Sequence, residues 1–276
     1  MTVETARSPA ARAWARFRRN RLGFWSLVLF VVLVVISLGA ELVSNDKPLA
    51  VRYEGQMYWP LWHSYPEKVF GGDFDTATDY LDPFIQAQLS KGSNWAVFPP
   101  NPYGANTINY FAQSPNPAPP TTANWLGTDD RGRDMLAQLL YGFRVSVLFA
   151  LALTATGVLL GVVTGAIQGF FGGKTDLVFQ RFIEIWGSMP ELYLLIIFSA
   201  VFAPSITLLL VLLSLFGWMG LSDYVRAEFL RNRQLDYVKA ARALGVSNGQ
   251  IIGRHILPNS MTPVATFLPF AMIAPI

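Results

Sequence analysis

The chain has no cysteine and only two histidines, His63 and His255, among its 276 residues. The absence of cysteine excludes disulfide bonds and thiol catalysis, and it removes the commonest ligand of structural zinc. The histidines lie far apart in the sequence, and the topology argued below places them on opposite sides of a membrane. We therefore expect no metal site of the kind that cysteine or histidine builds.

Charge is also scarce, because charged residues make up 14 % of the chain while hydrophobic residues make up 52 %. A soluble domain usually carries about 25 % charged residues. The apolar residues also stand in long runs rather than being dispersed, which is typical of membrane spans. Composition thus predicts an all-α polytopic membrane protein.

The first apolar run follows a basic segment. Residues 1–21 contain six arginines and one acid, Glu4, and residues 22–40 carry no charge. At about 1.5 Å per residue, this run nearly spans a hydrocarbon core of about 30 Å. A cleaved signal peptide is the alternative, but its apolar core is shorter, about 7–15 residues. We expect a retained transmembrane helix over residues 22–43 and, by the positive-inside rule, a cytoplasmic N-terminus over residues 1–21.

Residues 44–142 are then expected outside the cytoplasm, as a small irregular insert followed by an interfacial segment. The stretch 44–124 is rich in Pro, Gly, Asn and aromatic residues. Ala50–Tyr53 and Gln56–Trp59 flank Glu54-Gly55, a pattern that predicts a hairpin. The aromatic residues are compatible with a sugar- or peptide-binding surface. We favour a small core together with side chains that rest at the membrane interface.

An acidic cluster follows the insert. Its members are Asp129, Asp130 and Asp134. Carboxylates at close spacing suggest calcium, but Arg131 and Arg133 are interleaved and the spacing is not that of an EF-hand loop. We expect instead that Thr128 or Asp129 caps an interfacial helix whose arginines pair locally.

A glycine stripe marks the second span, which we place at about 143–167. Its members recur every four residues: Gly157, Gly161, Gly165 and Gly169. This spacing puts them on one helix face, where the missing side chains allow another helix to approach closely. The pattern predicts packing in a helix bundle.

The turn after this span contains Gly173-Lys174-Thr175, which looks like the end of a phosphate-binding loop. The preceding glycine, Gly169, is one residue too close, and no strand pattern comes before it. We interpret the segment as a tight cytoplasmic turn. The sequence thus predicts that the chain has no ATP site of its own.

The third span, at about 177–203, contains charges. Arg181 and Glu184 stand three residues apart, which favours a local ion pair. Glu191 lies deeper, and an acid within a span is a functional candidate because its burial is costly. It either lines a translocation path or, if Pro190 kinks the helix, lies near the far interface.

A fourth span at about 205–221 leads into a polar loop, residues 222–259. This loop carries six Lys or Arg and three acids, an excess that marks the cytoplasm and agrees with the number of preceding spans. Residues 260–276 resemble an incomplete span that contains two prolines, and at this length they cannot cross the membrane unaided. We expect the sequence to be truncated at its C-terminus.

The polar loop has the signals of two short helices. We expect the first at Tyr237–Leu244, ended by Gly245, which tolerates the left-handed conformation. Ser247 is a suitable N-cap for the second helix, and Pro258 closes it or opens the next span.

The same loop carries a family resemblance. Ala240-Ala241, the glycine four residues later and Leu257-Pro258 together resemble the EAA loop of ABC-importer permeases. Lys239 stands where the general pattern has Glu, and His255 stands where it has Ile; both departures are similar to the peptide-importer branch. LGTD-x-x-GRD at 126–134, with G-x-R-x-S at 142–146, resembles dipeptide and oligopeptide permeases. NDKPLAVRYEG at 45–55 resembles the microcin C permease subgroup.

This resemblance implies a type I ABC importer transmembrane fold, with residues 143–276 as the permease domain, in a bacterial inner membrane. The loop would dock onto a cytoplasmic ATPase, which binds ATP and Mg in place of any cofactor of this chain. The residues expected to couple are Lys239, Ala240, Ala241, Arg242, Gly245, His255, Leu257 and Pro258. Further partners implied are a homologous second permease subunit, a periplasmic peptide-binding protein and membrane lipid, but no nucleic acid.

Three alternatives explain less of the chain. An intramembrane enzyme needs a nucleophile and a base or a metal set within the spans, and the spans contain neither cysteine nor histidine. A secondary transporter predicts inverted repeats and more intramembrane charge than Arg181, Glu184 and Glu191 supply. A basic amphipathic loop of an unrelated membrane protein leaves the motif unexplained. We therefore expect an ATP-driven peptide importer subunit with no catalytic residue.

Overall fold

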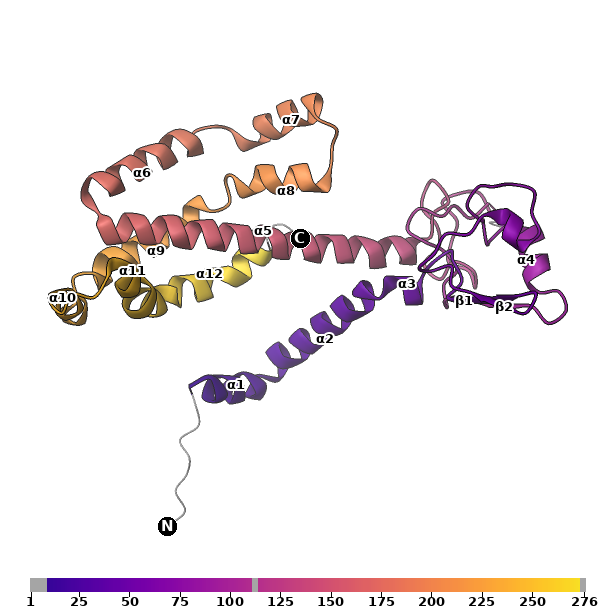
Figure 1. Cartoon of the computed structure of the whole chain (residues 1–276), viewed down its shortest axis with the longest axis horizontal. Coiled ribbons are helices and arrows are strands. Elements are labelled where there is room, and N and C mark those ends of the chain that lie inside the picture. Colours follow the sequence, from indigo (N-terminus) through magenta and orange to yellow (C-terminus); the bar gives the residue numbers. More distant parts are fainter. Residues whose placement is uncertain (1–8, 111–113, 274–276) are drawn as a thin grey trace, which may run out of the picture. The chain divides into compact units, whose positions relative to one another are not determined.

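The computed structural model describes residues 9–110 and 114–273. The chain forms two compact units, Met1–Val145 and Ser146–Ile276, and each is described by itself (Figure 1). The N-terminal unit begins with helices α1 (Pro9–Arg19), α2 (Arg21–Leu38) and α3 (Ala40–Val43). The Asn20 side chain caps α2, because its Oδ1 accepts a hydrogen bond from Gly23 N at 3.2 Å. Helix α2 is long and apolar enough to cross a membrane.

The insert, defined here as residues 44–134, is more ordered than its composition predicts. It contains strands β1 (Ala50–Tyr53), β2 (Gln56–Tyr58) and β3 (Trp95–Val97), the 3₁₀ helix η1 (Glu67–Phe70) and helix α4 (Pro83–Leu89). The strands form an antiparallel sheet in the order β2-β1-β3. The predicted hairpin is confirmed, since Glu54 and Gly55 both have positive φ, as a two-residue turn of type I′ requires.

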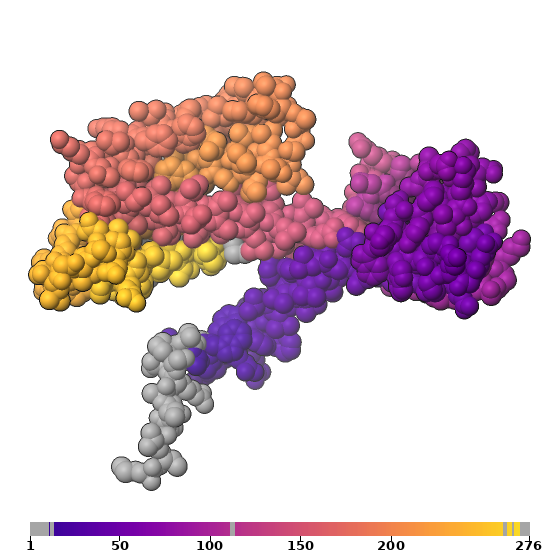
Figure 2. Space-filling view, viewed as in Figure 1, coloured from indigo at the N-terminus to yellow at the C-terminus, as the bar shows by residue number. Residues whose placement is uncertain are grey.

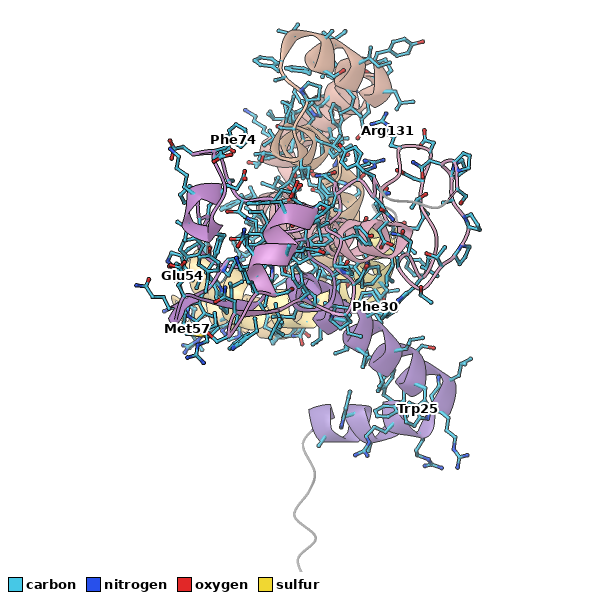
Figure 3. All side chains as sticks on the ribbon, turned by 90° about the vertical axis from the view of Figure 1, so that its right-hand side faces the viewer. Trp25, Phe30, Glu54, Met57, Phe74 and Arg131 are labelled. Carbon is cyan, nitrogen blue, oxygen red and sulfur yellow. The ribbon has the colours of Figure 1, made fainter. Side chains whose placement is uncertain are left out.

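The third strand was not predicted. It pairs with β1 across more than forty residues of chain, a separation that local patterns do not encode. The small core that we expected from the aromatic residues is present. It packs beside the sheet and consists of Val51, Tyr53, Phe70, Tyr80, Ile85 and Leu89. Figure 3 shows Glu54 and Met57 of the hairpin on the outer surface of the insert.

The acidic cluster leads directly into a long helix rather than into a separate interfacial helix. Helix α5 runs without a break from Met135 to Phe171. The expected cap was wrong: Asp134, fully buried, accepts a hydrogen bond from Ala137 N at 2.8 Å, whereas the Thr128 hydroxyl bonds within the loop, to Ala118 N and Asn116. The expected local pairing is present, because Arg133 Nη2 lies 2.6 Å from Asp129 Oδ2.

The C-terminal unit contains the rest of α5, followed by α6 (Gly173–Gly187), α7 (Glu191–Val201), α8 (Ile206–Ser214) and α9 (Met219–Asn232). Helices α7 and α8 form a hairpin (Figure 1). Their side chains line a pocket between them. The last elements are α10 (Asp236–Ala243), α11 (Asn248–Gln250), the π-helix η2 (Ile251–Ile256), the 3₁₀ helix η3 (Leu257–Ser260) and α12 (Met261–Ile273).

Two spans differ from the sequence expectation. The third is not continuous: α6 and α7 meet at a 68° bend, so they form either one broken span or a re-entrant pair. Pro190 causes the break, because it has no N–H to continue the helical ladder. The helical stretch of the fourth continues past 221, since residues 206–232 together satisfy the length and composition of one span. Of the charged residues in its last turns, Arg226 pairs with Asp176 of α6, whereas Glu228 and Arg231 pair with each other within α9.

Candidate coupling site

Helix α10 is amphipathic, and its two faces have different surroundings. Val238 and Ala241 are buried in a core shared with α5 and α9. Lys239 and Ala240 are exposed, and Lys239 pairs with Asp236 at 3.3 Å, within the same helix. The helix is thus fixed through one face and presents the other to its surroundings.

Gly245 makes the turn that ends α10. Its φ is +77°, the left-handed region that glycine adopts without strain. The turn is closed by Gly245 N, which donates to Arg242 O at 3.0 Å, and by Val246 N, which donates to Ala241 O at 3.1 Å. Apart from the two neighbouring residues, no described residue has an atom within 4 Å of the position that a Cβ would take at Gly245. The requirement for glycine here is therefore one of backbone conformation and not of space.

The second half of the loop returns to the same core. Ser247 caps α11, where its Oγ accepts a hydrogen bond from Gln250 N at 3.4 Å. The following π-helix places Ile251 and Ile256 fully inside the core. Such a widened turn is uncommon in helices and is frequent at functional sites. The sequence expectation of one regular second helix missed this change of geometry.

Three polar contacts hold the loop against α5 and α9. The Arg242 guanidinium lies over the Phe170 ring, 5.0 Å from its centroid. Arg233 Nη1 donates to Phe170 O at 3.3 Å. Asn232 Nδ2 donates to Ser260 Oγ at 2.8 Å, with both side chains buried. The loop therefore has direct attachments to the ends of two long helices.

The eight residues expected to couple fall into two groups. Ala241 is buried, while His255 and Leu257 are half-buried, so these three contribute to the core of the loop or its edge. The exposed members are Lys239, Ala240, Arg242, Gly245 and Pro258. Beside them, Leu244 is 84 % exposed, the highest value among the large hydrophobic residues of the described chain. Sequence reasoning missed Leu244, although an apolar residue next to a helix-ending glycine is a usable signal.

Leu244, Gly245 and the exposed residues beside them on α10 form what we call the exposed corner. It lies at one end of the C-terminal unit, away from the α7–α8 turn (Figure 2). The glycine stripe of α5 packs against α9 and against the turn that precedes α9. A Cβ at Gly165 would come within 2.5 Å of Ser222 O, and one at Gly169 within 2.4 Å of Phe229 Cβ. At Gly161 the nearest atoms are at 3.0 Å, and at Gly157 at 3.5 Å. Helices α5 and α9 therefore come closer together toward the C-terminal end of α5, where Phe170 contacts the loop.

A polar network that the sequence reasoning did not identify ties α6 to this helix pair. Gln168 is fully buried, and its Nε2 donates to Ser222 Oγ at 2.9 Å. Gln180 Nε2 of α6 donates to Gln168 Oε1 at 2.9 Å. Nearby, Arg226 and Asp176 form a two-bond ion pair, with Nη2 to Oδ2 at 2.7 Å. The sequence signal that could have identified this network is the presence of polar residues such as Gln168 and Gln180 inside apolar runs.

Glu191 lies in the first turn of α7, immediately after the break. An acid at a helix N-terminus is stabilised by the helix dipole, which gives Glu191 a structural role independent of transport. Its side chain is half-buried, and it does not line the pocket between α7 and α8. The predicted Arg181–Glu184 ion pair on α6 is confirmed.

Over residues 9–110 and 114–273 no group of three or more His, Asp or Glu side chains is arranged to hold a metal ion. In the same part of the chain, the glycines at 172 and 173 have positive φ and form a tight turn into α6, without the strand that a nucleotide-binding loop needs.

Comparison with known families gives two matches. Residues 136–276 match the family described as the binding-protein-dependent transport system inner membrane component. Residues 8–60 match the N-terminal transmembrane domain of oligopeptide transport permease C.

Individual relatives agree with these matches. The chain is 51 % identical over 270 residues to the inner membrane ABC transporter permease protein YejE of Escherichia coli, covering 98 % of this chain and 79 % of that one. It is 45 % identical over 285 residues to the peptidoglycan transport system permease protein YejE of Agrobacterium fabrum, covering 95 % and 74 %. It is 37 % identical over 144 residues to the oligopeptide permease OppC of Haemophilus influenzae, covering 52 % and 46 %.

Proposed function

Because the chain belongs to the family of binding-protein-dependent inner membrane permeases, in the oligopeptide and dipeptide branch of ABC importers, we propose that residues 235–259 couple it to a separate ATPase. The protein is a multi-pass inner membrane transport subunit and not an enzyme, and ATP binds to partner subunits. The observation that carries the proposal is the exposed corner at Leu244 and Gly245, whose inner face is packed on α5 and α9.

The corner has the mechanical properties that coupling needs. An exposed apolar side chain next to exposed basic residues is a compact contact for a partner protein. The buried side of the corner transmits a displacement, because packed cores move as units rather than deforming continuously. The Arg242–Phe170 and Asn232–Ser260 contacts would carry that movement into α5 and α9.

The assembly we propose contains a homologous second permease subunit, two ATPases and a periplasmic peptide-binding protein, with the N-terminus of this chain in the cytoplasm. The eight residues from Lys239 to Pro258 named above would form the ATPase contact and its support. The glycine stripe would hold α5 against α9, so that the two helices move together. Closure of the ATPases would then draw the loop toward its counterpart and open the spans outward.

The cargo we propose is a peptide of the oligopeptide or microcin C type. The relatives carry different cargo names, since OppC of Haemophilus influenzae is named for oligopeptides and YejE of Agrobacterium fabrum for peptidoglycan. A peptide joined to a cell-wall sugar is therefore the second candidate. Uptake of labelled oligopeptides and of labelled peptidoglycan fragments by the same reconstituted assembly separates the two.

The coupling proposal is tested by Gly245→Val. A β-branched residue at φ +77° is strained by roughly 1–3 kcal/mol, so the corner would rearrange. We expect cargo uptake to fall by about tenfold or more, while ATP hydrolysis by the assembly no longer responds to cargo and binding protein. The measurement is uptake and ATPase rate in proteoliposomes with the co-purified partner subunits.

Gly249→Ala is the matched control. Gly249 is also exposed, with open space around it, but it lies in α11 and its φ is not positive. This variant should keep uptake and cargo-stimulated ATP hydrolysis. Normal assembly and normal uptake by Gly245→Val would refute the assignment of this loop.

A further inference from the structure

The insert contains a large groove that the coupling role does not use. It lies between α4, β3 and the segment 98–110, and has a volume of about 1450 Å³. Pockets for small molecules usually measure about 300–1,000 Å³. The groove is thus large enough for a ligand of several residues, and every residue that lines it belongs to the N-terminal unit.

One wall of the groove is the open edge of a sheet. In the two-residue hairpin, Tyr53 and Gln56 form the hydrogen-bonded pair next to the turn, so the backbone groups of Tyr53 face β2 and those of Arg52 face β3. Arg52 is opposite Trp95 in the register, so the N–H and C=O of Ala96 face away from β1. Trp95 and Ala96 line the groove. Such an edge is a template for pairing with an extended peptide.

A buried hydroxyl group beside the groove has no well-formed hydrogen bond. Tyr80 lines the groove and is 3 % exposed; its Oη makes no hydrogen bond of good geometry among the described residues, and its polar neighbour is the Thr78 hydroxyl. The Thr78 hydroxyl donates to Tyr65 O at 2.8 Å. Burial raises the pKa of Tyr80 to about 12, although the Thr78 hydroxyl acts to lower it, so the phenol remains a neutral donor at physiological pH. Buried polar groups without partners are rare, and a ligand atom is one way to satisfy them.

The charges that line the groove are mainly negative. Asp46, Asp79 and Asp82 stand against a single cation, Lys47. Each acid also has a local bond: Asp46 accepts from the Thr107 hydroxyl, Asp79 from Leu81 N, and Asp82 caps α4. These bonds hold the carboxylates in place without neutralising them. The groove therefore favours a ligand with positive charge.

We propose that this groove binds a free, extended, positively charged peptide, which adds as a strand to β3 through Ala96. The acids would attract its cationic groups, and the Tyr80 hydroxyl would donate to its backbone or side chain. This would give the permease a peptide site of its own, separate from the spans. The proposal is independent of the ATPase-coupling loop and does not require its assignment to be correct.

The test is direct binding to the full chain in lipid nanodiscs. The probe is the hexapeptide Lys-Val-Thr-Lys-Val-Thr with a C-terminal fluorescein, followed by fluorescence anisotropy. We expect saturable binding in the micromolar range. Replacing both lysines of the peptide by glutamates should weaken binding at least tenfold at low salt, and the difference should shrink as salt rises. N-methylation of alternate peptide bonds, which leaves the protein unchanged, should also weaken binding at least tenfold.

Protein variants locate the site. Ala96→Pro removes the outward N–H, and proline is tolerated on edge strands, so binding should fall about tenfold. Ala96→Ser keeps the N–H and should bind as the unaltered chain does. Tyr80→Phe should weaken binding several-fold without lowering thermal stability, because the hydroxyl makes no well-formed hydrogen bond within the insert. Asp79→Asn should weaken only the lysine peptide.

Two outcomes overturn the proposal: no saturable binding of the lysine peptide, or equal binding of the lysine, glutamate and N-methylated peptides. Loss of binding in Tyr80→Phe that follows a loss of stability would also contradict the role given to its hydroxyl. Because the readout needs neither ATPase nor transport, failure here leaves the coupling proposal standing. Conversely, normal transport by Gly245→Val would not affect the peptide result.

Discussion

At the scale of single residues, Asp129 shows how one carboxylate organises a turn. It accepts hydrogen bonds from Arg131 N at 2.9 Å, Arg133 N at 2.8 Å and Arg133 Nε at 2.8 Å, and also from Gln138 Nε2 at 3.0 Å. Burial acts to raise the pKa of Asp129, but these hydrogen bonds outweigh it and hold the pKa well below its usual range. The turn that leads into α5 therefore depends on the ionised form.

This dependence predicts the behaviour of the turn in acid. A carboxyl group whose folded pKa is lowered contributes stability above its unfolded pKa, 3.8, and that stability is lost as the pH falls toward the folded value. We expect amide hydrogen exchange at Arg131 and Arg133 to lose protection below about pH 4. Asp129→Asn should show reduced protection already at neutral pH. Protection that is unchanged by this substitution would contradict the role of the carboxylate.

Some residues could be predicted from the sequence and others could not. Gly245 was predictable, because a glycine after an alanine-rich helix is a local signal, and its φ of +77° agrees. Asp134 was not, because Thr128, Asp129 and Asp134 are all suitable caps by type. The choice among them depends on Asn101 and Asn124, which donate to the buried Asp134 carboxylate from distant parts of the chain.

At the scale of elements, α5 and α9 are held at close range by missing side chains. At Gly165 the atoms nearest to a Cβ include two backbone atoms, Ser222 O at 2.5 Å and Arg226 N at 3.0 Å. Backbone of a packed helix cannot move aside as a flexible side chain does. The helix pair must therefore separate to accept even a methyl group.

Two matched glycine substitutions in α5 test this packing. Gly165→Ala should destabilise the chain by roughly 1–3 kcal/mol, because the added methyl overpacks the contact with α9. Gly142→Ala should be neutral or stabilising by up to about 1 kcal/mol, because no atom lies within 4 Å of its Cβ position and alanine favours the helix. The measurement is unfolding of the purified chain by SDS, followed by far-ultraviolet circular dichroism. Equal effects at both positions would contradict the packing role.

Elements that depend on local sequence patterns could be predicted, whereas features that depend on contacts between distant residues could not. The apolar runs and the four-residue glycine period are local, so the existence of the helices and the packing face could be predicted. The bend between α6 and α7 depends on Pro190, which the sequence marked only as a possible kink. The extension of α9 to Asn232 was hidden by its charges: Arg226 pairs with Asp176 of α6, and Glu228 pairs with Arg231 within α9.

At the scale of the whole molecule, the role of Glu191 in transport remains a prediction. The cost of an acid within the bilayer, about 2.5–3.5 kcal/mol, favours a functional reason for it, while its place at the start of α7 offers a structural one. If it lines the path, Glu191→Gln should lower cargo uptake several-fold at normal protein level. Uptake of labelled peptides in proteoliposomes measures this.

Glu184→Gln is the matched control for that experiment. Glu184 belongs to the same broken span, but it is exposed and paired with Arg181, so its loss should cost at most about 1 kcal/mol and leave uptake unchanged. Unchanged uptake of every tested peptide by Glu191→Gln would remove the path role and leave only the helix-start role.

The bend at Pro190 has one more consequence, for hydration. No donor within the described residues reaches the carbonyl oxygens of Gly187 and Met189. Lipid offers no hydrogen bonds, and each unsatisfied backbone group in it costs several kcal/mol. If α6 and α7 form one broken span, these oxygens need water or a neighbouring subunit as hydrogen-bond donor. The break in the helix is therefore a position where we expect hydration or a subunit contact within the span.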